Sequence, residues 1–184
     1  MTGQSLRDLD SCKARYRRPK EPVAEEVLIP ALERADDFRC MVGYFGSGAL
    51  RELAPGLASY VFNSDQPLRL LVSPAISPQD QEALENGLKQ AEEVAGQTLE
   101  DLFGDQAALA DELARHTKRC LAYLIASERL EMKVVVVRGG IFHLKEWIVT
   151  QGADILVLSG SANFTGAALK SNHEILHLHR SWRG

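Results

Sequence analysis

Three short apolar runs set the fold class open to this chain of 184 residues. They read FRCMVGYF at 38–45, LRLLV at 68–72 and MKVVVV at 132–137. Runs of four to eight residues rich in valine, leucine and aromatic residues are typical of buried strands. Segments with the apolar spacing of helices lie between these runs. Because strands and helices alternate in this way, the sequence predicts an α/β domain.

Several segments repeat apolar residues every three or four positions, which is the helical period. We expect helices over 22–35 and 49–62 and a short one over 166–170. Two further helical runs fall within 78–130. They interrupt the alternation of strands and helices, so we expect a helical hairpin inserted near 78–130 into the α/β body.

The C-terminal third is rich in strands. After the run at 132–137, we expect strands over 141–149, 154–158 and 174–179. The overall prediction is therefore a mixed β-sheet flanked by helices, with one helical insertion. The sequence contains no internal repeat and no glycine-rich phosphate loop ending in Gly-Lys-Ser/Thr, so the chain carries no nucleotide motor of its own.

Charge is distributed unevenly along the chain. The 25 acidic residues exceed the 21 Lys and Arg residues, and the net charge of −4 argues against a general nucleic-acid coat protein. The stretch 80–112 holds ten acids and one lysine, so the rest of the chain is net positive. An acidic stretch repels phosphate, and a polyanion would have to bind elsewhere on the surface.

The N-terminal segment is polar and basic. KARYRRPK at 13–20 contains five cations and no acid. We expect residues 1–20 to form a basic arm, either a solvated tail or an arm that contacts phosphate, and residues 21–184 to form the folded domain.

Cysteine usage and hydropathy bear on the compartment. Cys12, Cys40 and Cys120 are an odd number at wide spacings, which indicates neither a disulfide framework nor a zinc site. The N-terminus lacks the apolar core of a signal peptide, and no apolar run approaches the roughly 20 residues that cross a bilayer. We therefore expect a cytoplasmic protein without a membrane partner.

The chemistry-bearing residues gather between 142 and 175. His143 and Lys145 stand two apart on a predicted strand, so both side chains should lie on one face of it. The next predicted strand ends in the loop from Gly160 to Asn163 (GSAN), which offers small hydrogen-bonding side chains suited to phosphate oxygens. Glu174 follows at the start of another strand, where it could accept a hydrogen bond from an imidazole.

These residues resemble the H-x-K…G-S-x-N…E signature of the phospholipase D superfamily. The order of predicted elements over 22–180 is also similar to one superfamily unit. The phrases GYFGSGAL and LVSPAIS resemble the phospholipase D-like domain at the N-terminus of bacterial superfamily II helicases and in some restriction endonucleases. One departure is Thr150, which stands where the family pattern has an aspartate. If the predicted hairpin is extended, Asp154 would occupy a related place.

The resemblance implies covalent catalysis without a metal or other cofactor. His143 would attack phosphorus to give a phosphohistidine, which water then hydrolyses. Lys145, Asn163 and Ser161 would bind the phosphate oxygens, and Glu174 would orient His143. A second histidine must protonate the leaving group. Because this chain has a single H-x-K, we expect a homodimer that shares one active site.

Three functions remain open at this point. The first is a nuclease of a restriction or helicase system that acts on nucleic acid, more often DNA than RNA. The second is a weak or degenerate DNA-binding domain attached to a helicase. The third is a phospholipid phosphodiesterase, which the absence of an amphipathic membrane-facing segment disfavours. The sequence stops directly after a strand at 181–184, which we interpret as the sign of a longer natural protein with an ATPase region.

Other residues in this region have simpler interpretations. A lone His143 would more often be a surface or core histidine, and the assignment rests on the whole motif. His177 and His179 alternate with leucines on a predicted strand, so they should face away from the core, and zinc binding is disfavoured. Trp147 and Trp182 are expected to be core or interface residues.

Overall fold

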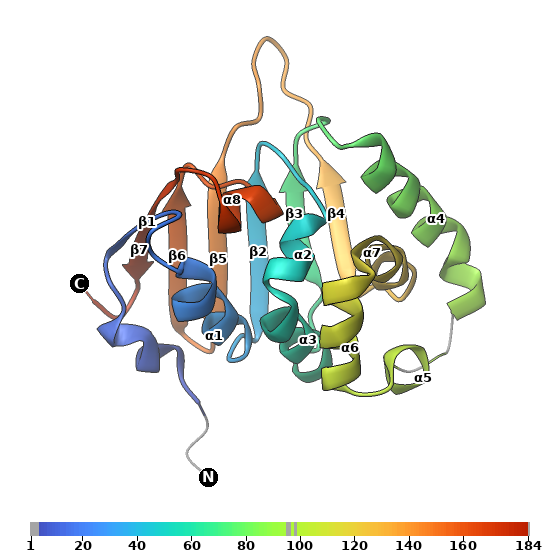
Figure 1. Cartoon of the computed structure of the whole chain (residues 1–184), viewed down its shortest axis with the longest axis horizontal. Helices are drawn as coiled ribbons and strands as arrows, with labels where there is room; N and C mark the ends of the chain where they lie inside the picture. The colour runs from blue at the N-terminus through green and yellow to red at the C-terminus, as the bar shows by residue number, and fades with distance from the viewer. Residues whose placement is uncertain (1–3, 95–96, 98, 184) are drawn as a thin grey trace.

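A computed structural model describes residues 4–94, 97 and 99–183. These residues form a mixed seven-stranded sheet of order β1-β7-β6-β5-β2-β3-β4 (Figure 1). β2, β3 and β4 run parallel to one another, and the other neighbouring pairs are antiparallel. The strands are β1 (Arg15–Arg17), β2 (Asp37–Val42), β3 (Leu68–Val72), β4 (Leu130–Val134), β5 (Lys145–Gln151), β6 (Asp154–Gly160) and β7 (Ile175–Arg180).

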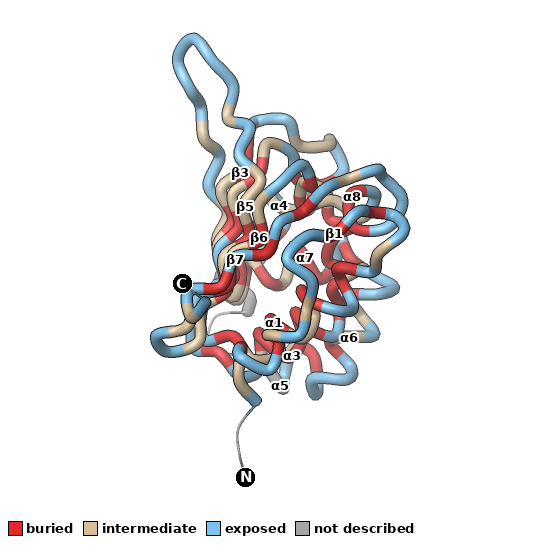
Figure 2. Tube along the Cα trace, turned by 90° about the vertical axis from the view of Figure 1, so that its left-hand side faces the viewer, coloured by how far each residue is buried: buried red, intermediate tan, exposed pale blue. Residues whose placement is uncertain are grey.

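The helices lie on one side of this sheet, so the domain has two layers. In Figure 2 the strands β3, β5, β6 and β7 stand to the left of the helices α6, α7 and α8. The helical elements are η1 (Leu6–Ser11), η2 (Ala24–Leu28), α1 (Ile29–Leu32), α2 (Gly48–Glu52), α3 (Ala54–Asn63), α4 (Pro78–Val94), α5 (Leu99–Phe103), α6 (Gln106–Arg115), α7 (Thr117–Ala126) and α8 (Gly166–Lys170). The predicted α/β class, mixed sheet and helical insertion are confirmed.

The core lies between the sheet and the helices. Phe38 on β2 is fully buried and meets the rings of Tyr60 and Trp147 edge to face, each at 6.4 Å between centroids. The buried Tyr60 hydroxyl accepts a hydrogen bond from the Phe38 amide at 3.2 Å and donates to the Pro67 carbonyl at 3.3 Å. Satisfying this hydroxyl avoids a desolvation cost of about 1–3 kcal/mol. Trp147 is thus a core residue, as predicted, and Trp182 packs against the edge of the core.

The helical insertion packs as a unit through α4 and α7. Gly87 on α4 makes the contact possible, since an added Cβ would lie 2.5 Å from the Ala122 carbonyl oxygen on α7. Leu109 and Leu113 of α6 and Leu121 and Leu124 of α7 are fully buried. The insertion therefore belongs to the same core as the sheet.

The far face of the sheet is not covered by a helix of the described chain. We call it the open face; its side chains include Arg15, Arg17, Asp37, Arg39, Met41, Arg69, Leu71, Glu131, Lys133, Ile148, Thr150, Ile155, Val157, Ile175, His177 and His179. Alternation along each strand explains this composition, because successive side chains point to opposite faces. On β2, for example, Phe38, Cys40 and Val42 are buried, while Asp37, Arg39 and Met41 are not.

Residues 4–20 do not form a solvated tail, which was one of the two forms considered for the basic N-terminal arm. Leu6 and Leu9 of η1 are buried, and β1 pairs with β7 with Tyr16 fully buried beneath it. The buried Arg18 guanidinium donates to backbone carbonyls of Glu21 and Lys170. Residues 4–20 are therefore part of the domain, and residues 1–3 lie outside the described residues.

Two predicted strands have different limits in the structure. The run at 132–137 was expected to be one buried strand, but β4 ends at Val134, and Val136 is 79% exposed. The strand predicted over 141–149 begins only at Lys145. Residues 135–144 form a loop that projects beyond the end of the sheet, at the top of Figure 1. His143 is therefore a loop residue and not a strand residue.

Candidate active site

The five residues singled out in the sequence come together at one edge of the sheet. His143 and Lys145 stand where β5 begins, Ser161 and Asn163 follow the end of β6, and Glu174 precedes β7. Since β5, β6 and β7 are antiparallel neighbours, the start of β5, the end of β6 and the start of β7 fall at the same edge. In Figure 1 this is the upper edge of the sheet, beside α8.

His143 rests against the backbone of the strand next to it. An ideal Cβ added to Gly43, just after β2, would lie 2.9 Å from His143 Cδ2 and 3.1 Å from its Cα, so glycine permits the approach. The Gly43 amide donates to the Leu144 carbonyl at 2.9 Å, and the Ser73 hydroxyl donates to the Gly43 carbonyl. His143 is exposed, and its ring has no hydrogen-bond partner in the described part of the chain. The backbone around His143 is thus held in place, and the imidazole ring is free to bind a ligand.

Lys145 supplies a cation beside His143. Its Nζ donates to the His143 carbonyl oxygen at 3.1 Å. Partial burial lowers the Lys145 pKa, because desolvation disfavours the charged ammonium, while the carboxylate of Glu174 acts in the opposite direction. The lysine is therefore electrostatically coupled to the other end of the motif.

Glu174 holds Ser161 instead of His143. The Ser161 hydroxyl donates to Glu174 Oε2 and accepts from the Ile175 amide at 3.0 Å, while Asn172 Nδ2 donates to Glu174 Oε1 at 3.3 Å. The expected hydrogen bond between Glu174 and His143 is not formed in this structure. Both carboxylate oxygens are already engaged, so the glutamate orients the loop after β6.

Asn163 presents its amide donors to the site. Its Oδ1 accepts a hydrogen bond from the Tyr44 backbone amide at 3.0 Å, which directs the NH₂ group away from that contact. No other hydrogen bond of this side chain is formed among the described residues, so its two N–H donors can serve an anionic ligand.

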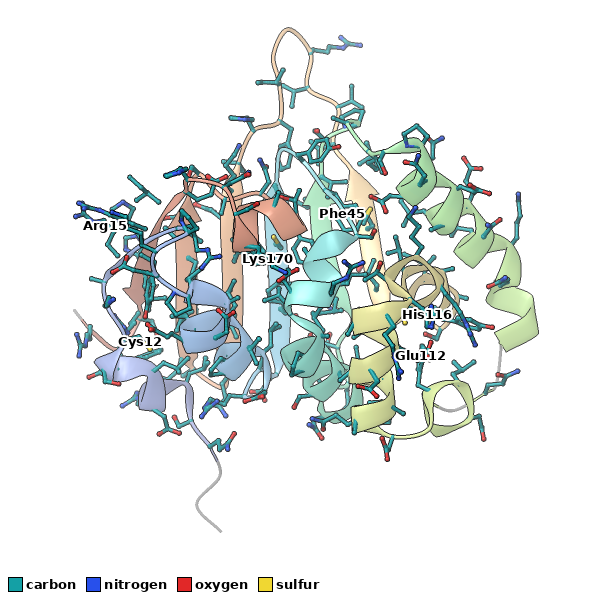
Figure 3. All side chains as sticks on the ribbon, viewed as in Figure 1. Cys12, Arg15, Phe45, Glu112, His116 and Lys170 are labelled. Atoms are coloured by element: carbon teal, nitrogen blue, oxygen red, sulfur yellow. The ribbon has the colours of Figure 1, made fainter. Side chains whose placement is uncertain are left out.

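A stack of aromatic rings supports the loop that carries Ser161 and Asn163. Trp147 stacks on Phe164 at 5.1 Å, and Phe164 stacks on Phe45 at 5.7 Å between centroids. Trp147 Nε1 donates to the Ala162 carbonyl at 3.3 Å. Phe45, labelled in Figure 3, lies just after β2, so the stack ties the loop after β6 to the loop after β2.

Gly160 is the point at which this loop leaves the sheet. An added Cβ there would lie 2.0 Å from the Ile175 carbonyl oxygen. The same carbonyl accepts a hydrogen bond from the Ser161 amide at 3.0 Å. Only glycine lets the two backbones pass this closely, which explains the first letter of the GSAN sequence.

Sequence reasoning missed the contributions of Gly43, Tyr44 and Ser73. They follow β2 and β3, far from the motif in sequence, and parallel pairing of these strands brings them to the same edge. The sequence feature that could have indicated these residues is the Gly43-Tyr44 pair near the end of the apolar run FRCMVGYF.

Thr150, at the position of the family's aspartate, and Asp154 both lie away from the site. Thr150 pairs with Asp37 and Ile155 on the neighbouring strands. It stands five positions along β5 from Lys145, so the two residues are about 17 Å apart at the usual rise per residue. Asp154 lies at the same far end and forms an ion pair with Arg7 at 2.8 Å, which lowers the Asp154 pKa. Neither residue can act on a ligand held at His143.

Two other features of the described residues lie outside this site: a pair of histidines on β7 and a cavity on the open face. His177 and His179 lie exposed on β7, and within the described residues no three His, Cys, Asp or Glu side chains are arranged to hold a metal ion. A cavity of about 990 Å³ lies on the open face. Its charged side chains pair with one another: Asp37 with Arg39 and Arg69 at 2.7 and 2.6 Å, and Glu131 with Lys133 at 2.7 Å. The edge at His143 is therefore the better candidate.

Comparisons with known proteins add one likeness. Among solved structures, the chain matches NucT from Helicobacter pylori with a TM-score of 0.46 and 16% sequence identity, over 89% of this chain and 82% of that chain. No protein-family model and no curated protein sequence matches the chain. Within the described residues, no helix is long and apolar enough to cross a membrane.

Proposed function

We propose that this chain is a phosphodiesterase of the phospholipase D type that cleaves nucleic acid, DNA more often than RNA. The observation that carries the proposal is the convergence of His143, Lys145, Ser161, Asn163 and Glu174 at one edge of the sheet. An unpartnered imidazole, an ammonium and amide donors form the set that a phosphoryl transfer needs. The proposal also rests on the H-x-K…G-S-x-N…E resemblance.

The reaction proceeds in two displacements. An imidazole nitrogen of His143 attacks phosphorus, the P–O bond to the leaving group breaks, and that oxygen takes a proton from a second histidine. Water then attacks the phosphohistidine, the P–N bond breaks, and the second histidine receives the water proton. Lys145 and Asn163 stabilise the charge that builds on the nonbridging oxygens. Glu174 acts through Ser161, which it orients.

A second candidate function is favoured by one observation. The His143 ring has no acid partner among the described residues to fix its tautomer. A chain of this kind would hold DNA phosphates at the same edge with little or no cleavage, next to a helicase region of a longer protein. The restriction or helicase setting is part of this proposal and follows from the resemblance of GYFGSGAL and LVSPAIS.

Cleavage is expected to persist in excess EDTA. The proposed site uses the fixed cation of Lys145 where many nucleases use Mg²⁺. Labelled single- and double-stranded DNA, labelled RNA, bis(p-nitrophenyl) phosphate and phosphatidylcholine would be incubated with 10 mM EDTA or with Mg²⁺. Nucleic-acid cleavage at equal rates in both buffers supports the proposal. Loss of cleavage in EDTA, or hydrolysis confined to phosphatidylcholine, contradicts it.

The second histidine is proposed to be His143 of the partner subunit in a C₂ homodimer. A two-fold axis beside the site would place the two imidazoles on opposite sides of one phosphate. If both are required, mixing wild-type and His143→Ala subunits at a 1:1 ratio should leave about one quarter of the undiluted wild-type activity, because only homodimers of wild type stay complete. The mixture would be refolded together and assayed at fixed total protein. Retention of one half, or cleavage by a species that light scattering identifies as a monomer, contradicts the shared site.

A further inference from the structure

The edge strand β1 carries two arginines on the open face of the sheet. Tyr16 between them is fully buried, so Arg15 and Arg17 both point to the opposite side. Arg15 pairs with His177 and Arg17 pairs with Ile175 across the β1–β7 ladder. Directly opposed residues share a face, so the arginines and His177 form one cluster. Figure 3 shows Arg15 at the outer edge of the sheet with its side chain directed into solvent.

These two guanidinium groups differ from the other arginines of the open face. Arg39 and Arg69 are paired with the carboxylate of Asp37. Neither Arg15 nor Arg17 makes a side-chain hydrogen bond or an ion pair with a described residue. The nearby Glu21 is occupied, because it accepts from Lys13 Nζ at 2.8 Å and from the Arg17 backbone amide at 2.5 Å. The positive charge of the cluster is therefore available to an external anion.

The cluster is joined to the candidate active site through β7. The Arg18 amide donates to the Glu174 carbonyl at 2.9 Å, and the Ile175 amide donates to the Ser161 hydroxyl at 3.0 Å. Arg17, Ile175 and Ser161 are thus lateral neighbours on three adjacent segments. Two strand spacings separate Arg17 from Ser161, which is about 10 Å between backbones.

We propose that Arg15 and Arg17, with His177, bind the backbone phosphates of a polynucleotide strand that runs along β1 to the catalytic edge. The proposal rests on the proposed function, because it assigns the path of the substrate beyond the bond that is cleaved. Residues two apart on a strand are about 6.7 Å apart, so the arginines form a linear row suited to a linear polyanion. His177 adds an imidazole hydrogen-bond donor, and Ile175, which is 45% exposed, offers apolar contact for a sugar or base.

The test compares two double variants of equal charge. Arg15→Gln/Arg17→Gln removes two charges from the cluster, and Arg115→Gln/Arg119→Gln removes two exposed charges from α6 and α7 of the insertion. Binding of a fluorescent 20-nucleotide single-stranded DNA would be followed by anisotropy from 50 to 200 mM NaCl, with His143→Ala in every protein so that the DNA stays intact. Loss of two phosphate contacts should weaken binding roughly tenfold and flatten the log–log salt slope by about 1.4. The insertion variant should bind as its parent does.

Further arms separate the possible failures. Arg15→Lys/Arg17→Lys keeps both charges and should retain binding within about threefold of its parent, and circular dichroism verifies that each variant is folded. Equal effects of the cluster and insertion variants would overturn the phosphate row while leaving the proposed function intact. A parent that neither binds the DNA nor, with His143 restored, cleaves it would overturn both. Binding that appears on phosphatidylserine vesicles and not on DNA would assign the cluster to a membrane and overturn the proposal.

Discussion

Replacement of His143 by alanine is expected to lower the rate of phosphodiester cleavage by at least about 10³-fold. The proposed reaction forms its first bond at this imidazole, and no neighbouring side chain can replace it: Lys145 is bound to the His143 carbonyl and Ser161 to Glu174. The measurement is kcat/KM on bis(p-nitrophenyl) phosphate and on DNA. The melting temperature of the variant should stay within a few degrees of wild type, because the ring is exposed.

His116→Ala is the matched control for that substitution. His116 is also exposed, but it lies between α6 and α7 of the helical insertion, away from the candidate site. The activity of the His116→Ala variant should equal that of wild type. If His143→Ala instead unfolds the protein, the histidine has a structural role, and if it folds and cleaves normally, the phosphohistidine mechanism is wrong.

Replacement of Gly160 by alanine should give the largest loss of stability among single substitutions at the site. The new Cβ would lie 2.0 Å from the Ile175 carbonyl oxygen, a backbone atom that cannot rotate aside. Separating β6 from β7 at this point would also break the hydrogen bond that the Ser161 amide donates to the Ile175 carbonyl. We expect the free energy of unfolding to fall by about 2–4 kcal/mol, measured by urea denaturation.

Gly140→Ala is the control for that loss. Gly140 lies in the exposed loop before β5, and an added Cβ would have ordinary contact with Val137 at 3.7 Å. Its stability should change by less than about 0.5 kcal/mol. A Gly160→Ala protein as stable as Gly140→Ala would mean that the loop after β6 can shift freely, and the supporting role assigned to Gly160 would then be wrong.

The class of fold followed from sequence because the short apolar runs that form β2, β3 and β4 alternate with helical segments. The residues at which the strands begin and end did not follow from the sequence. MKVVVV is apolar apart from Lys133, yet its partner β3 ends at Val72, and Ser73-Pro74 follow. The Val135 amide donates a hydrogen bond to the Val72 carbonyl. The hydrogen-bond ladder ends there, because Pro74 has no N–H to donate to β4. The remaining valines therefore leave the sheet despite their strand propensity.

The N-terminal strand escaped prediction for a different reason. KARYRRPK contains one buried residue, Tyr16, and alternation over three residues carries too little signal to mark a strand. What orders it is pairing with β7, about 160 positions later in the chain. Local charge suggested a tail, and long-range hydrogen bonding overrides it.

The sequence predicted the residues of the candidate site but not their contacts. The motif supplied all five residues that meet at the sheet edge, because antiparallel neighbours bring strand ends together. It did not supply the partner of Glu174, which is Ser161, nor the role of Gly43 in seating His143. Both depend on how closely two backbones approach, and residue types alone do not encode that distance.

The pairing of β1 with β7 has a consequence for how the chain reaches its native state. Arg15 and His177 lie about 160 positions apart in the chain, so the ladder between them cannot form until β7 has been synthesised. Such high contact order slows folding. Until β1 docks, β7 is an unprotected edge strand with the apolar alternation ILHLHR, the kind of edge on which a second nascent chain can add. Once paired, the short basic strand β1 covers this edge of β7.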